Sequence, residues 1–448
     1  MIPIMDFQRR SVTGPVMQAD DFDLEFAMKV RALVRDYEIR YDPAQLIVDD
    51  RTADAVFAAG LELLAGVGLY HMETRRVVRY ERAELEQIAQ ESRARPADVT
   101  LGRGRDTMFL RYRRGSDAWA PTNYAGAPTV AEEAWFIEYV QSFVQEPSVA
   151  GIGIPPGLAR LGNIEPKAGT LSEVAVGLWE QAALQEALRR AGRPDLNLGL
   201  LGTVSTFGGT LAMMGPGLRE AWNTQIGIHI LPEQKLDWSR LLLAQYCQNR
   251  GIEPWQSSMS CLGGLCRDAA DTAVGMVANA LGQLSYAHGA TMSFFPSHLD
   301  GTWATRDSHW AFSAAARACE RHLGLAVGTS ISGIVPSWRT PLSLLQSAAI
   351  VAVYVPSGMS YSWISGHTGL EARLINEMME AATRLSAGQA NELAQRIMRR
   401  VDELLPAARE PLPFPQAYDL KTVTPLPDYE AGMLRVRDEL AALGMPYR

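Results

Sequence analysis

The fold is decided by three short apolar runs near the middle of the chain, QIGIHIL (225–231), WQSSMSCL (255–262) and ATMSFFP (290–296). Each run has the length of a strand and mixes apolar residues with Gly, Ser or Thr. Longer stretches with apolar residues at helical spacing separate the runs, at 237–250 and 266–287. Strands that alternate with helices in this way predict βα units and a parallel sheet.

The same alternation extends in both directions from this centre. The predicted strands are 119–124, 148–154, 196–204, 225–231, 255–262, 290–296, 325–333 and 359–364. Further helices are predicted at 131–145, 171–191 and 309–322. Eight βα units in about 250 residues match a TIM (β/α)8 barrel, so we predict an α/β fold of that kind. An open doubly wound sheet is the alternative, but GIGIPPG at 151–157 has prolines where a dinucleotide-binding helix offers free N–H groups.

Helical segments flank the barrel on both sides. Residues 1–115 are predicted to form an N-terminal helical cap with a hairpin, whose strands are Leu69–Met72 and Val77–Tyr80. Residues 116–385 form the barrel, and residues 386–448 form a C-terminal helical extension that packs on it. The last helix is expected to start near Asp428 and to end at Gly444.

Composition excludes several classes of protein. The net charge of the 448 residues is −8, which argues against nucleic acid as a partner because phosphate binding needs concentrated positive charge. No apolar window is long enough to span a membrane, and the first residues lack the apolar core of a signal peptide, so we expect a cytoplasmic protein. The four cysteines form no CxxC pair and no histidine lies at zinc-finger spacing, so no metal site is predicted.

Six collinear stretches resemble the monomethylamine:corrinoid methyltransferases of methylotrophic archaea. They are GLYHMETRRVVRY (68–80), LGRGRD (101–106), AGRP (191–194), HLDG (298–301), TGLEAR (368–373) and YDLKTVTP (418–425). The resemblance runs from about residue 7 to residue 445. It implies a TIM barrel in a homo-oligomer, a hexamer in the family. It also implies transfer of a methyl group from a small-molecule donor to the cobalt of a corrinoid (cobalamin), which a partner protein carries and this chain does not bind tightly.

The resemblance fails at the residues that activate the amine in that family. The family's pyrrolysine falls within Gly199 to Leu201, its two glutamates fall on Gly227 and Ser257, and its glutamine falls near Ser330. All four positions are small or apolar in this chain. We therefore expect Leu201, Gly227, Ser257 and Ser330 to line a substrate site that works without pyrrolysine.

A quaternary ammonium or sulfonium donor suits such a site, because its leaving group departs neutral and needs no covalent activation. Aromatic faces bind these cations. Trp303, Tyr361 and Trp363 are predicted substrate-binding residues at the barrel mouth, with Trp255 and Trp338 nearby. The alternative for each ring is packing between the barrel and its helices. Methyl ethers and thioethers are further candidate donors.

Three polar side chains are candidate catalytic groups. His298 and Asp300 follow the sixth predicted strand, and their spacing on an extended segment would direct both side chains the same way. A hydrogen bond that only fixes the loop is the alternative reading. His229 lies two residues after Gly227, so the two residues share one face of their strand.

Further polar groups lie on and after the fifth predicted strand. Gln256 joins Ser257 there as a predicted substrate-binding residue, and the N–H groups of Gly263 and Gly264 suit either an anion or a tight turn. Two functions remain open: a corrinoid-dependent methyltransferase that favours quaternary amines, or a barrel lyase or hydrolase with histidine and aspartate as acid–base groups. A non-catalytic binding role is a third reading.

Overall fold

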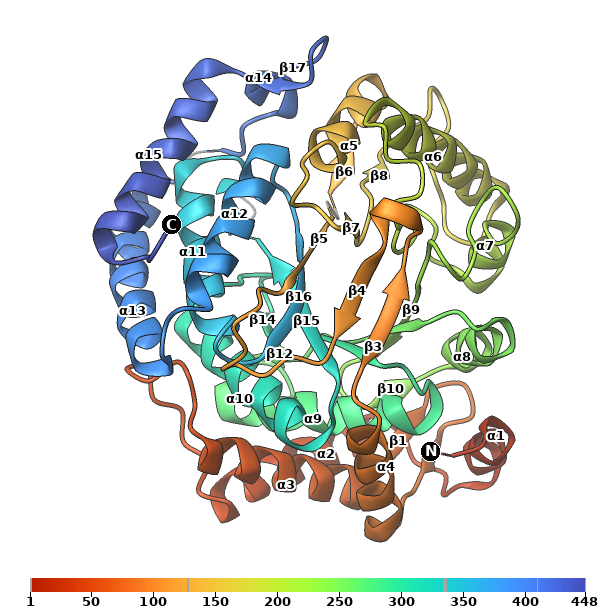
Figure 1. Ribbon diagram of the computed structural model, residues 1–448. Helices are drawn as coiled ribbons and strands as arrows, with labels where there is room; N and C mark the ends of the chain where they lie inside the picture. Colours follow the sequence, from red (N-terminus) through yellow and green to blue (C-terminus); the bar gives the residue numbers. More distant parts are fainter. Residues whose placement is uncertain (1, 127–128, 333–336, 409, 448) are drawn as a thin grey trace.

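A closed parallel barrel forms the centre of the molecule. The structure is a computed structural model that describes residues 2–126, 129–332, 337–408 and 410–447. The barrel strands are β5 (Thr122–Ala125), β7 (Gly151–Ile152), β9 (Ile226–Ile230), β11 (Pro254–Ser258), β13 (Thr291–Phe294), β15 (Ala326–Ile331) and β16 (Met359–Ile364). They pair in the order β7-β5-β16-β15-β13-β11-β9, with all neighbours parallel (Figure 1).

An irregular segment closes the barrel between β7 and β9. Ile152 N donates to Asn197 O and Leu200 N donates to Gly153 O, at 2.9 and 2.7 Å. On the other side, Leu198 N donates to Asn223 O at 2.8 Å and Gln225 N donates to Gly199 O at 3.3 Å. The segment thus fills the eighth position, and the prediction of a TIM barrel is confirmed.

The predicted strand at 196–204 is wrong as a regular element. Gly199 has a φ of 60°, a left-handed conformation that interrupts a β ladder. A Cβ atom on Gly199 would lie 2.0 Å from Gly153 O, so this close approach of two backbones requires glycine.

Helices surround the barrel. They are α5 (Phe136–Val144), α6 (Leu171–Arg190), α8 (Trp238–Arg250), α9 (Ala269–Tyr286), α10 (Arg306–His322), α11 (Pro341–Tyr354) and α12 (Gly369–Ala382). All of them except α11 overlap predicted helical segments. Side-chain caps start several of them: Asp268 accepts from Ala270 N and Asp271 N at the start of α9, and Thr305 accepts from Ser308 N at the start of α10. Helix α9 is buried along its whole length, because the N-terminal helices cover its outer side.

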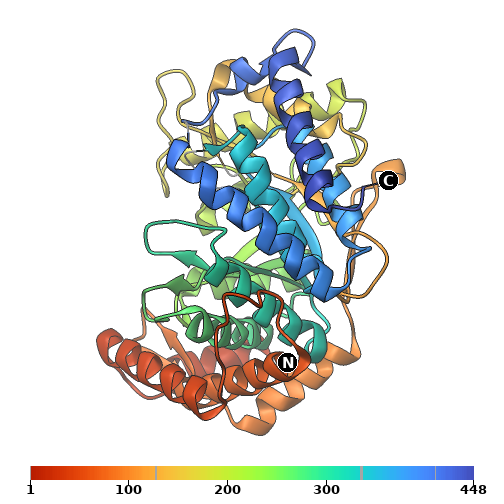
Figure 2. The ribbon, with the colours of Figure 1, turned by 90° about the vertical axis from the view of Figure 1, so that its left-hand side faces the viewer.

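The helices of the N-terminal segment cover one side of the barrel, and its second hairpin packs against residues inside the barrel. Its elements are α1 (Ile4–Thr13), α2 (Ala19–Asp36), α3 (Asp50–Val67), β1 (Leu69–His71), β2 (Arg76–Val78), α4 (Arg82–Ala94), β3 (Asp98–Leu101), η1 (Gly104–Asp106) and β4 (Met108–Arg111). Helix α3 packs on α9 and α10, and both views show these helices together at the bottom (Figures 1 and 2). The predicted hairpin is confirmed as antiparallel β1 and β2. Leu101 and Leu110 of the second hairpin pack with Tyr124 and Tyr361 inside the barrel.

The C-terminal segment packs against α11 and α12 on another side of the barrel (Figure 2). It contains α13 (Ala387–Leu404), η4 (Leu405–Ala407), α14 (Phe414–Ala417), β17 (Tyr418–Asp419), β18 (Thr424–Pro425) and α15 (Pro427–Leu443). Small elements in the loops complete the fold: β6 (Val130–Ala131), η2 (Glu133–Trp135), β8 (Gly157–Leu158), α7 (Phe207–Ala212), β10 (Lys235–Leu236), β12 (Cys261–Leu262) and β14 (Ser297–His298). The division of the chain after residues 115 and 385 stays a prediction.

Among the described residues, no helix is both long enough and apolar enough to cross a membrane.

Candidate functional site

A cavity of 580 Å³ lies toward the carboxyl ends of the barrel strands. Its inner walls come from β9, β11, β15 and β16, and its outer walls come from the loops that follow the strands. Ser205, Met259 and Gly301 belong to its lining and are exposed, so the cavity opens to solvent between three loops. This is the end of a TIM barrel at which active sites form.

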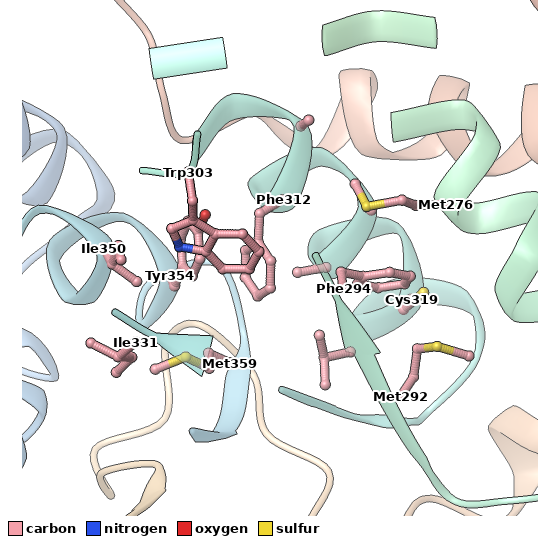
Figure 3. Packing of buried hydrophobic residues seen from close by; sticks show 14 of the residues in the cluster. Met276, Met292, Phe294, Trp303, Phe312, Cys319, Ile331, Ile350, Tyr354 and Met359 are labelled. Carbon is pink, nitrogen blue, oxygen red and sulfur yellow. The ribbon is translucent and has the colours of Figure 1, made fainter. Parts of the chain in front are cut away.

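One wall of the cavity is a chain of aromatic rings. The ring centroids of Trp255 and Trp363 are 4.3 Å apart, those of Trp363 and Phe295 are 5.3 Å apart, and those of Phe295 and Trp303 are 5.6 Å apart. Trp303 also belongs to the large buried cluster that includes Phe312 and Tyr354 (Figure 3). Burial on the far side therefore fixes a ring whose near side faces the cavity.

Hydrogen bonds beneath the cavity hold Trp255 in place. Its Nε1 donates to Ser293 Oγ at 2.9 Å and to Tyr361 Oη at 3.2 Å, and these two hydroxyl groups are 2.7 Å apart. Tyr361 is fully buried in this layer and is not part of the cavity lining. Tyr361 was predicted to bind substrate, but in the structure its hydroxyl instead holds Trp255 in place.

His229 is the titratable side chain in the described part of the lining. Its Nδ1 forms a hydrogen bond with Ser257 Oγ, and its ring meets Trp255 edge-on at 5.3 Å. Burial lowers the pKa of His229 to about 4, and the nearby Arg240 adds to this effect. The imidazole is therefore neutral at pH 7, and the described lining carries no Asp, Glu, Lys or Arg side chain.

Most of the predicted substrate-binding positions meet at this cavity. Leu201, Gly227, Trp303, Ser330 and Trp363 line it, together with His229. The two residues of β11 predicted to bind substrate, Gln256 and Ser257, do not line it. Gln256 Nε2 donates to Gly289 O and Thr291 O, both at 3.1 Å, and is fully buried. Ser257 lies behind His229.

The structure contradicts the predicted geometry of His298 and Asp300. Residues 298–301 form a turn in which Gly301 N donates to His298 O at 2.9 Å, so the segment is not extended. His298 Nε2 lies 3.1 Å from Thr305 Oγ1 and 3.3 Å from Asp307 Oδ1. Asp300 is exposed and accepts from Thr302 N, which holds the pKa of its carboxyl below the usual range. Neither residue belongs to the cavity lining.

Two buried carboxylates of α6 fix the loop that forms another wall. Glu173 accepts from Ser205 N and Thr206 N at 2.8 and 2.9 Å, and Glu180 accepts from Thr203 N at 3.0 Å. Burial raises the pKa of Glu180, whereas for Glu173 the hydrogen bonds outweigh the effect of burial and lower its pKa. Sequence reasoning missed both. Their spacing of seven residues places both on one face of the predicted helix, and this pattern could have indicated that they act together.

No group of His, Cys, Asp and Glu in the described ranges has the arrangement of a metal site, and the four cysteines are free. Gly263 N donates to Cys266 O and Gly264 N donates to Cys261 O. These N–H groups are therefore used in a tight turn, and the anion site considered for them is not formed.

Comparison with known proteins identifies the family. Residues 2–445 match the family described as "Monomethylamine methyltransferase MtmB". The chain is 24% identical to the monomethylamine methyltransferase MtmB of Methanosarcina mazei and to MtmB2 of Methanosarcina acetivorans, covering 99% of this chain and 98% of each relative.

Solved structures show the same fold. The crystal structure of the Methanosarcina barkeri monomethylamine methyltransferase and that of a hydroxylamine MtmB complex each superimpose with a TM-score of 0.92. Each is 22% identical in sequence, and the match covers 99% of this chain and 98% of theirs. The chain belongs to the monomethylamine methyltransferase family and is a methyltransferase.

Proposed function

We propose that this protein transfers a methyl group from a quaternary ammonium compound to the cobalt of a corrinoid held by a separate protein, and that it does so without pyrrolysine. The observation that carries this proposal is the aromatic wall of a neutral cavity, formed by Trp255, Phe295, Trp303 and Trp363. A quaternary ammonium has no N–H to donate, so ring faces are what recognise it. Each ring contributes about 0.5–2 kcal/mol.

The small side chains at the family's activating positions support a donor that needs no activation. Leu201, Gly227 and Ser330 line the cavity, and none can form a covalent adduct with an amine. A primary amine that is not protonated needs such help because it would leave as an amide anion. A quaternary ammonium leaves as a neutral tertiary amine, with the C–N electron pair remaining on nitrogen.

The residues of this chain would bind, orient and shield the donor. The buried rings of Trp255 and Trp363, 2% and 1% exposed, exclude water from the ammonium. One methyl group would then face the open mouth, and the corrinoid supplies the cobalt nucleophile that takes it. The exposed apolar side chains of Met259, in the cavity lining, and of Leu299, two residues before Gly301 of the lining, fit the approach of a large, flat macrocycle on a partner protein.

The resemblance supports two further proposals: a cytoplasmic homo-oligomer, hexameric as in the family, and a corrinoid that is not bound tightly by this chain. The alternative of a lyase or hydrolase is less well supported, because two of its three acid–base groups, His298 and Asp300, lie outside the cavity lining, which includes His229.

The test of this function is the loss of the cob(I)alamin absorbance band in the presence of the purified protein and a panel of methyl donors. Quaternary ammonium compounds should react, while monomethylamine and methyl ethers should not. Absence of turnover with every quaternary donor, with both free cobalamin and a cognate corrinoid protein, would overturn the proposal.

His298 supplies a test of whether the loop before α10 positions the cavity wall. In a His298→Ala variant we expect KM for the donor to rise about threefold to tenfold with kcat nearly unchanged, because the contacts of His298 with Thr305 and Asp307 brace the loop that carries Trp303. A residue that transfers a proton would instead lower kcat by about 10²-fold or more. Steady-state kinetics separate the two results, and a thermal melt controls for folding.

A further inference from the structure

The hydrogen bonds around His229 favour one of its two neutral tautomers. Within the described chain, the one hydrogen-bond partner of Ser257 Oγ is His229 Nδ1, so the serine hydroxyl has this nitrogen as its acceptor. Gln283 holds Ser257 in place through both backbone groups: Oε1 accepts from Ser257 N at 3.1 Å, and Nε2 donates to Ser257 O at 2.7 Å. With Nδ1 as an acceptor, the neutral imidazole carries its proton on Nε2.

Gly227 leaves room for this proton to face the cavity. A Cβ atom on Gly227 would lie only 2.9 Å from His229 Nε2. The imidazole thus occupies the space that a side chain at position 227 would need. Both residues belong to the cavity lining, and Nε2 has no hydrogen-bond partner among the described residues. His229 therefore presents a free N–H donor to whatever the cavity binds.

Trp303 provides a second donor that lacks an acceptor. Its indole Nε1 is buried and has no hydrogen-bond partner in the described part of the structure, and the whole residue is 8% exposed. A buried donor left unpaired costs about 1–3 kcal/mol. This nitrogen is itself inaccessible from the cavity, so the N–H of His229 is the donor that points to a ligand with an oxygen acceptor.

The absence of charge from the described lining restricts the ligand further. A bare organic cation would enter this cavity without a counter-charge, and burial of an uncompensated ion is costly. A zwitterion brings its own counter-charge and has no net charge to compensate. It also provides the oxygen acceptor that the N–H of His229 lacks.

We propose that the methyl donor is a zwitterionic quaternary ammonium with a carboxylate on a short arm, bound through the carboxylate by His229 Nε2–H and through the ammonium by the aromatic wall. This inference rests on the proposed function and names its substrate class. His229 is then a substrate-binding residue, and Ser257 is a positioning residue that sets its tautomer.

Calorimetric binding to the purified, corrinoid-free protein tests the inference independently of methyl transfer. The probes are trimethylammonioacetate and isobutyltrimethylammonium, which differ by the exchange of a carboxylate for an isopropyl group of similar shape. We expect the zwitterion to bind at least tenfold more tightly to the wild type. We expect His229→Phe to abolish this preference and His229→Gln, which keeps an N–H donor, to retain part of it.

Two further variants complete the experiment. Ser257→Ala should weaken the preference without removing it, because Nδ1 then loses its fixed donor. His322→Phe is the matched control, since His322 stacks on Phe57 outside the cavity, and it should leave the preference unchanged. A preference that survives in His229→Phe, or a wild type that favours the isobutyl compound, would overturn the inference. Failure of both compounds to bind would instead count against the proposed function.

Discussion

Replacement of Gly227 with glutamate is expected to reduce methyl transfer from a quaternary donor by at least about 100-fold, equivalent to about 2.7 kcal/mol in the activation barrier. The physical reason is the 2.9 Å between a Cβ atom at this position and His229 Nε2. A glutamate side chain must displace the imidazole from Ser257, and it places a carboxylate in a cavity whose described lining has no cation to pair with it.

Gly227→Ala is the control for this variant. A single methyl group requires only a shift of the His229 ring, so we expect a loss of about tenfold or less, at the low end of the roughly 1–3 kcal/mol that overpacking costs. Steady-state kinetics with the same donor measure both variants. Gly227→Glu protein that remained folded and fully active would show that the space beside His229 has no part in catalysis.

Removal of the buried guanidinium of Arg219 is expected to give the largest loss of stability. Arg219 Nη1 donates to Leu198 O and Gly199 O at 2.8 and 3.0 Å, and Nε donates to Gln181 Oε1 at 2.7 Å. These bonds hold the irregular segment that closes the barrel. Burial lowers the pKa of Arg219 to about 10, so the group remains charged at pH 7. Arg219→Met leaves Leu198 O and Gln181 Oε1 without their donor, at about 1–3 kcal/mol each, while Gly199 O still accepts from Thr224 Oγ1 and Gln225 N.

The melting temperature measures this effect. We expect Arg219→Met to melt several degrees below the wild type, because each kcal/mol lowers the melting temperature of a large domain by about 2–4 °C. Arg435→Met, at an exposed position, should change it little. Equal melting temperatures for the two variants would show that Arg219 does not secure the closure.

Local patterns in the sequence predicted the regular strands well. Residues 359–364 form β16 with the predicted bounds, and the alternation in QIGIHIL correctly assigned Gly227 and His229 to one face. The segment at 196–204 failed because its hydrogen bonds depend on two distant neighbours and on the left-handed Gly199, neither of which a strand pattern records.

The site was predictable where it depended on strand register and less so where it depended on loops. Trp363 and Ser330 alternate into the barrel as their strands require. The shared side-chain direction predicted for His298 and Asp300 was wrong, because residues 298–301 form a turn instead of an extended segment. Glu173 and Glu180 were missed because their partners, the backbone groups of residues 203–206, are distant in sequence and come together only in the fold.

The most direct test of the central claim is a single-turnover reaction of the protein with a ¹³C-methyl-labelled quaternary donor and cob(I)alamin, followed by NMR of both products. We predict that the labelled methyl group appears on cobalt in the same amount as the demethylated tertiary amine. Formation of the amine without label on cobalt, or no reaction of the donor alongside turnover of monomethylamine, would contradict the account.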